Sequence, residues 1–190
     1  MVDLGTETDA VIVARALVER DSFAVLIARY EAKLLRYIRR LGVRNEEDRE
    51  DILQDIFIKV YRNLRAFDPR LSFSSWIYRI AHNETMSWFR KRSARPDHAL
   101  VDDGDTVLGM LAGDDDTVEA HMTQEVQEEV RAALEALPQK YRDILVLRFF
   151  EEKSYEEIAD ILQMPLGTVA TLVHRAKAKL KTLVPEHVYI

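Results

Sequence analysis

Apolar side chains recur at intervals of three and four residues along most of this chain, and this spacing constrains the fold more than any other feature. In the first such run the recurring residues are Phe23, Leu26, Ile27, Tyr30, Leu34, Tyr37, Ile38 and Leu41. These intervals place the side chains on one face of a helix. A strand needs alternation with period two, and no stretch keeps that alternation for long enough. The sequence therefore predicts an all-α fold.

Two more helices are predicted before residue 95. The apolar spacing continues over residues 48–64, after Gly42 has ended the first helix. Beyond an Asp-Pro breaker, Ser74 or Ser75 is expected to cap a third helix. That helix is expected to end near the basic run at residues 90–92.

The last third of the chain returns to the same spacing. Apolar residues repeat helically over residues 126–137 and 141–150. Ser154, followed three residues later by Glu157, forms the sequence signature of a capping box at the start of the next helix. A short turn containing a proline and a glycine then leads into a final helix, expected at about residues 166–180.

Acidic residues are concentrated between the two helical blocks. The formal charge of −6 divides into +4 for residues 1–96, −11 for residues 97–129 and +1 for residues 130–190. Helical periodicity is lost where the acids gather, which is typical of a solvated linker. We therefore expect two small helical domains joined by an acidic flexible linker. The expected parts are an N-terminal extension with the start of a first helix at 1–19, a first domain at 20–95, the linker at 96–124 and a second domain at 125–185.

Composition narrows the class of protein. The chain has no cysteine, which excludes disulfides and thiolate metal sites and fits a reducing cytoplasm. Acidic rather than basic residues stand near the N-terminus, so a signal peptide is not expected. No apolar run approaches the roughly 18 residues that a membrane span needs. We expect a cytoplasmic protein that does not insert into a membrane and that uses no cofactor or metal.

The two short helices around the turn near residue 165 describe a helix-turn-helix, whose second helix enters the major groove of DNA. The alternative is an ordinary helical hairpin with solvated lysines. Lys179 and Lys181 extend the basic face of the second helix. The outward residues expected to reach base edges or phosphates are Thr168, Ala170, Thr171, His174, Arg175 and Lys177.

A run of aromatic and basic residues covers residues 67–92. Single-stranded nucleic acid is held by this mixture, because aromatic faces stack on bases and cations follow the phosphates. The alternative is that the tryptophans, Trp76 and Trp88, belong to the core. The residues of this run proposed to contact DNA are Phe67, Phe73, Trp76, Arg79, Asn83, Arg90, Lys91 and Arg92.

An enzymatic function would have to use the acidic cluster at residues 114–116 together with His121. These acids stand in an aperiodic, glycine-bearing segment, and a catalytic site needs rigidly supported groups. His82 and His174 have no carboxylate partner nearby in the sequence. We therefore expect that the protein is not an enzyme.

Three segments, in order, resemble the σ factors of bacterial RNA polymerase. Residues 50–61, EDILQDIFIKVY, are similar to σ region 2.2, whose usual form is EDLVQETFLRVW. The sequence WIYRIAHN at residues 76–83, followed by WFRKR at 88–92, resembles regions 2.3 and 2.4. Leu137 to Arg142, the YEEIA segment and the Gly-Thr-Val at residue 167 resemble region 4. Housekeeping regions 1.1 and 3 have no room, so the resemblance is to the extracytoplasmic function (ECF, group 4) members of the σ70 family.

The resemblance implies a function and a set of partners. Asp51, Gln54 and Asp55 share one helix face, which in the family docks on the β′ clamp helices of core RNA polymerase. The other implied partners are the β subunit, promoter DNA and an anti-σ factor. The segment from Phe67 to Arg92 would open the −10 element, and the last helix would read the −35 element. The expected function is thus promoter recognition, DNA melting and transcription initiation by the polymerase.

The chain departs from the family in one place. After Gly-Thr-Val the family commonly has a basic residue, a serine and another basic residue, whereas this chain has Ala170, Thr171 and Leu172. Two cations that would bind phosphate or guanine are absent, which leaves Thr171, His174 and Arg175 as the main candidates for −35 recognition. The competing function is an autonomous helix-turn-helix regulator, which accounts for residues 138–183 but gives residues 48–92 no role.

Overall fold

A computed structural model describes residues 7–94 and 124–184. Within these two ranges the regular structure is helical and contains no strand, which confirms the all-α prediction. No helix in them is long and apolar enough to cross a membrane. The expected linker lies almost wholly outside the described residues, together with the acids at 114–116 and His121.

The elements are α1 (Asp9–Ala16), η1 (Arg20–Ser22), α2 (Phe23–Arg40), α3 (Glu46–Asn63), η2 (Leu64–Ala66), α4 (Phe73–Ser93), α5 (Gln124–Ala136), α6 (Gln139–Leu145), η5 (Val146–Phe150), α7 (Tyr155–Leu162) and α8 (Leu166–Lys181).

Capping residues set the limits of the helices in the first half. Gly42 ends α2 with a φ of +110°, a conformation that a side chain makes unfavourable. Asn45 caps α3 by accepting a hydrogen bond from the backbone N–H of Asp48. The prediction that Ser74 or Ser75 caps α4 is wrong. Ser72 is the cap and accepts from the backbone N–H of Ser75, because its own backbone is still extended.

The helix-turn-helix is formed by α7 and α8. Ser154 and Glu157 form the predicted capping box at the start of α7 through two reciprocal hydrogen bonds. Gln163 ends α7 in the left-handed conformation, and α8 begins directly after Pro165. Upstream of the motif, α6 runs into η5, a π-helical segment rather than a continuous α-helix.

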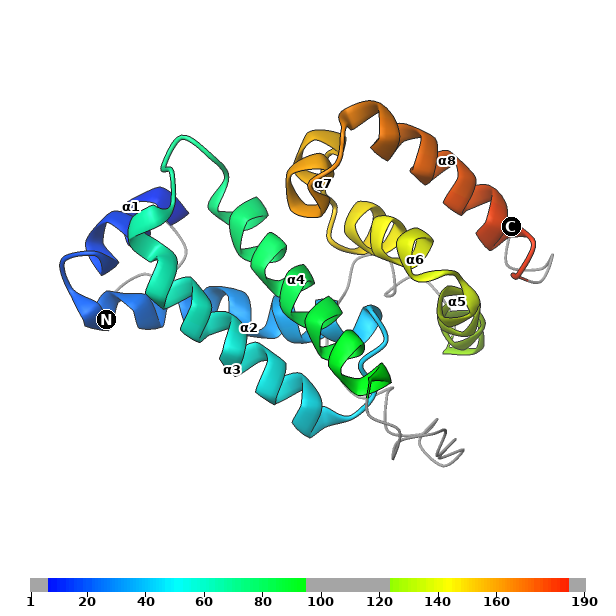
Figure 1. The fold of residues 1–190 in the computed structure, drawn as a ribbon, viewed down its shortest axis with the longest axis horizontal. Coiled ribbons are helices and arrows are strands. Elements are labelled where there is room, and N and C mark those ends of the chain that lie inside the picture. The colour runs from blue at the N-terminus through cyan, green and yellow to red at the C-terminus, as the bar shows by residue number, and fades with distance from the viewer. Residues whose placement is uncertain (1–6, 95–123, 185–190) are drawn as a thin grey trace.

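The helices form two groups that pack against each other (Figure 1). In the first group α2, α3 and α4 lie side by side and α1 packs on α2. In the second group α8 contacts α6 and α7. The groups meet mainly where α7 packs on α4. Consequently α4 belongs to the core of the first group and also provides the surface on which the second group rests.

A buried ion pair lies at the contact between the two groups. Arg40 Nη1, at the end of α2, is 2.9 Å from Glu151 Oε1, and the two side chains are only 7% and 6% exposed. The hydroxyl of Tyr78, on α4, donates to the other oxygen of the same carboxylate. Burying charge in this way is tolerable only while both partners are present and hydrogen-bonded.

Further polar contacts surround that pair. Lys153 Nζ lies 2.6 Å from Ser74 Oγ and packs over the ring of Tyr78. Arg142 Nη1 donates to the carbonyl oxygen of Leu41 at 3.0 Å. A Cβ atom on Gly42 would lie only 2.6 Å from that same Nη1, so Gly42 also makes room for the second group.

His82 and Asp143 face each other across the same contact, with Nε2 and Oδ2 3.9 Å apart. Burial lowers the pKa of His82 to about 4, and burial raises the pKa of Asp143 to about 6. At neutral pH the imidazole is therefore uncharged, and the contact is not an ion pair. Asp143 instead accepts a hydrogen bond from Gln139 Nε2. The buried charged pair between the two groups is accordingly Arg40 with Glu151, and a second, more exposed ion pair joins Arg44 to Glu135 at 2.7 Å.

Glu151→Gln is expected to loosen the packing of the two groups, because it takes the counter-charge from a buried guanidinium at a cost of about 3–5 kcal/mol. The chain has no native cysteine, so labels at Ala66→Cys and Ala178→Cys can report the separation by energy transfer. Transfer should fall in Glu151→Gln and stay unchanged in the control Glu156→Gln, whose side chain is exposed. Equal transfer in both variants would contradict the role assigned to Glu151.

Candidate functional site

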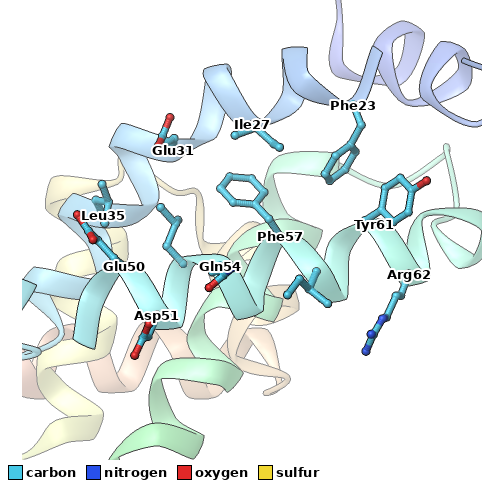
Figure 2. Close-up of a pocket in the computed structure, with 12 residues that line it drawn as sticks. Phe23, Ile27, Glu31, Leu35, Glu50, Asp51, Gln54, Phe57, Tyr61 and Arg62 are labelled. Carbon is cyan, nitrogen blue, oxygen red and sulfur yellow. The ribbon is translucent and has the colours of Figure 1, made fainter. Parts of the chain in front are cut away.

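A groove of about 670 Å³ runs between α2 and α3 (Figure 2). Its floor is aromatic: the ring of Phe23, on α2, stacks edge-on with that of Tyr61 at 5.1 Å and that of Phe57 at 6.5 Å. Tyr61 is 43% exposed and Ile58 is 40% exposed, so large apolar side chains face the solvent here. The groove is lined by Phe23, Ile27, Glu31, Leu35, Glu50, Asp51, Leu53, Gln54, Phe57, Ile58, Tyr61 and Arg62.

Charged side chains border the groove unevenly. Glu50 and Asp51 lie at one end, and Arg62 lies at the other (Figure 2). Of the three residues predicted to bind polymerase, Asp51 and Gln54 line the groove. Asp55 is exposed on the same helix but does not line it.

The sequence reading missed the α2 side of this groove. Ile27 and Leu35 repeat in the same apolar pattern as the fully buried residues of α2. Ile58 likewise follows the buried Phe57. Periodicity identifies apolar positions, but only the angle between two packed helices decides which of them stay partly uncovered.

The predicted −10 residues divide into a buried and an exposed set. Phe67 and Phe73 are buried and stack on each other at 5.4 Å. The ring of half-buried Trp76 completes the cluster, with its centre 5.2 Å from that of Phe67 and 5.6 Å from that of Phe73. The ring of Tyr30 also packs on Phe73. Phe67 and Phe73 are thus core residues here, and base stacking by either would first require it to be uncovered.

The exposed −10 candidates lie along α4 and at its end. Asn83 is exposed, and Arg79 is half-buried. Arg90, Lys91 and Arg92 are exposed in the last turn of the helix. There Arg92 contacts the ring of Trp88 and forms an ion pair with Asp48 at 3.2 Å. These residues form the basic end of α4.

The residues predicted to read the −35 element all lie on α8. Val169, Val173 and Ala176 are buried against α6 and α7, which turns the opposite face of the helix to solvent. Lys177 Nζ lies 5.0 Å from the ring centre of Phe149. All six predicted −35 residues are exposed, namely Thr168, Ala170, Thr171, His174, Arg175 and Lys177.

No group of three or more His, Cys, Asp or Glu side chains in residues 7–94 and 124–184 could hold a metal ion. An apolar groove with an acidic end, a basic helix end and an exposed helix-turn-helix are instead the features of a protein that binds a protein partner and DNA.

Comparison with known families identifies that class. The family described as Sigma-70 region 2 matches residues 26–95, and Sigma-70, region 4 matches residues 127–180. The ECF RNA polymerase sigma factor SigW of Bacillus subtilis is 34% identical over 169 residues, which cover 86% of this chain and 89% of that protein. The ECF RNA polymerase sigma-E factor of Haemophilus influenzae is 33% identical over 177 residues, covering 88% and 93%. The chain belongs to the σ70 family and, within it, to the ECF σ factors.

Solved structures agree with this assignment. CnrH in complex with the cytosolic domain of CnrY matches with a TM-score of 0.68 and 25% identity, over 93% of this chain and 97% of that one. The sigma factor RpoE of Bartonella quintana, in complex with the anti-sigma factor NepR, matches with a TM-score of 0.67 and 22% identity. The RpoE match covers 85% of this chain and 95% of that one, and it supports the fold alone.

Among the −10 candidates, replacing a buried residue should lower the stability of the fold, whereas replacing an exposed residue should not. Phe73→Ala should cost about 3–5 kcal/mol of unfolding free energy, because it empties the aromatic cluster. Asn83→Ala should change that free energy by no more than about 0.5 kcal/mol. Urea unfolding of both variants measures the difference. A Phe73→Ala variant as stable as wild type would show that the cluster is not part of the core.

Proposed function

We propose that this σ factor binds core RNA polymerase through the α2–α3 groove and directs the polymerase to promoters, where α4 contacts the −10 element and α8 the −35 element. The groove is the observation that carries the polymerase contact. Exposed large apolar side chains beside a set of charged ones are typical of protein–protein interfaces. The domain bounds of 20–95 and 125–185, and the residue roles given above, stay predictions within this proposal.

The shape and charge of the groove favour a helical partner. An amphipathic helix lays its apolar face into such a groove between two helices. Glu50 and Asp51 would pair with cations beside that apolar face, and Arg62 with an acid at its other end. This is the arrangement expected if the clamp helices of the β′ subunit lie along α3.

Contact with both promoter elements requires the two helical groups to separate. The centres of the −10 and −35 elements are about 25 base pairs apart, or roughly 85 Å along the DNA. Here α7 packs on both α4 and α8, so α4 and α8 lie only about 20 Å apart. We infer that polymerase binding opens the Arg40–Glu151 contact.

Three further parts belong to the same proposal. The protein acts in the cytoplasm, where its polymerase and promoters are. It catalyses no reaction itself, since the polymerase supplies the chemistry. An anti-σ factor is proposed as a partner, because the structures of CnrH and RpoE that this chain resembles are complexes with CnrY and NepR.

The groove can be tested by placing charge on its apolar floor. Ile58→Glu should weaken core polymerase binding about tenfold or more, since a buried interface position would then hold an uncompensated carboxylate. Reversing Asp51 and Asp55 to lysine should also weaken core polymerase binding, because the lysines would repel the cations proposed on the partner helix. Val18→Glu is the matched control, because Val18 is 85% exposed and lies outside the groove. Fluorescence anisotropy with labelled core enzyme gives the affinities, and equal affinity for all variants would exclude the groove.

Run-off transcription tests the function as a whole. Core polymerase with this protein should start transcripts at defined sites on genomic fragments, whereas core polymerase alone should not. In a parallel gel-shift assay, the protein without polymerase should bind the same duplexes weakly. Tight duplex binding by the free protein, with no polymerase-dependent start sites, would favour the autonomous regulator instead.

A further inference from the structure

The first half of α8 offers DNA an uncharged surface. From Leu166 to Val173 no side chain carries a charge or an amide group. Within this stretch Val169 and Val173 are buried, while Thr168, Ala170 and Thr171 are exposed. The residues that enter the major groove most deeply in a helix-turn-helix are those at the start of the second helix. The positions best placed to touch bases are therefore small and uncharged, and two of the three, Thr168 and Thr171, carry a hydroxyl beside a methyl group.

Thr171 uses its hydroxyl within its own helix. Its Oγ1 donates to the carbonyl oxygen of Gly167 at 3.0 Å. The hydroxyl can donate to a base only by giving up that bond, while the methyl group needs no partner. Thr171 is exposed, so this methyl group is available for contact. Ala170 adds a second methyl group beside it.

Cations on α8 begin only in its second half. Arg175, Lys179 and Lys181 are exposed, and Lys177 lies over the ring of Phe149. Discrimination of guanine rests on a bidentate arginine or lysine, and discrimination of adenine on asparagine or glutamine. The first two turns of α8 contain none of these residue types. The cations that follow are placed to hold phosphates, which positions the helix without reading sequence.

We infer that α8 recognises thymine C5-methyl groups in the −35 element by apolar contact with Thr171 and Ala170, with Arg175 and Lys179 on the flanking phosphates. Contact with the thymine methyl is the mode of base readout that alanine and threonine methyl groups provide. The inference rests on the proposed function, because it takes α8 as the helix that enters the groove.

The test begins with holoenzyme and a promoter library randomised across the −35 element. Thymines enriched by selection are then replaced one at a time by uracil, which removes only the C5-methyl group and keeps base pairing. Loss of a buried methyl contact should weaken promoter-complex formation about fourfold at the contacted thymine. Uracil at thymines of the spacer between the two elements, which neither α4 nor α8 is proposed to contact, serves as the control and should leave complex formation unchanged.

Two substitutions at Thr171 assign the contact. Thr171→Ser removes the methyl group and keeps the hydroxyl, whereas Thr171→Val keeps a methyl group and removes the hydroxyl. Thr171→Ser should bind the thymine promoter about fourfold more weakly and show no further loss with uracil. Thr171→Val should bind like wild type and stay sensitive to uracil. Circular dichroism confirms that both variants keep the helix.

The outcomes separate the inference from the function on which it rests. Wild-type complexes that are indifferent to uracil at every −35 thymine overturn methyl readout and leave the σ function standing. Weak binding by Thr171→Val, with normal binding by Thr171→Ser, assigns readout to the hydroxyl and also overturns it. Failure of the wild-type holoenzyme to form any promoter-dependent complex contradicts the proposed function itself, and the inference with it.

Discussion

The buried contact of Arg40 with Glu151 determines how this σ factor is arranged. A guanidinium and a carboxylate at low exposure are stable only in each other's presence, and Tyr78 supplies a further hydrogen bond to the carboxylate. Because Arg40 belongs to the first helical group and Glu151 to the second, this pair ties the groups together where α7 packs on α4. Buried apolar residues of the two groups form one continuous core beside it.

The ion pair and hydrogen bonds at this contact suit groups that must separate, although apolar residues of both groups also meet there. If two apolar faces came apart, the exposed surface would cost about 25 cal/mol for each Å². Arginine, glutamate, lysine and tyrosine hydroxyl groups are instead rehydrated when they meet water, which offsets the loss of their mutual bonds. Contacts between domains that move are generally more polar than permanent ones. The contact is thus strong enough to order the free protein and reversible enough for a partner to open it.

The sequence predicted the helices well because their signals are local. Apolar spacing located α2 and α3 to within about two residues, and the Ser154–Glu157 capping box was confirmed. The cap of α4 was assigned wrongly, since Ser72, Ser74 and Ser75 stand within four residues and only backbone conformation selects Ser72. The aromatic residues around Phe73 pack on one another, and their contact with DNA stays a prediction. Composition alone does not distinguish a stacking platform from a core cluster.

By itself the sequence determined the fold class, the two helical groups, the σ-type motifs and the uncharged start of α8, because each depends on the spacing of residues close together in the chain. Tertiary structure alone decided three other features. These are the groove between α2 and α3, the burial of Phe67 and Phe73, and the joining of Arg40 to Glu151. Each requires residues from separate helices to meet, and the angles and distances at which helices pack are not written in any local pattern.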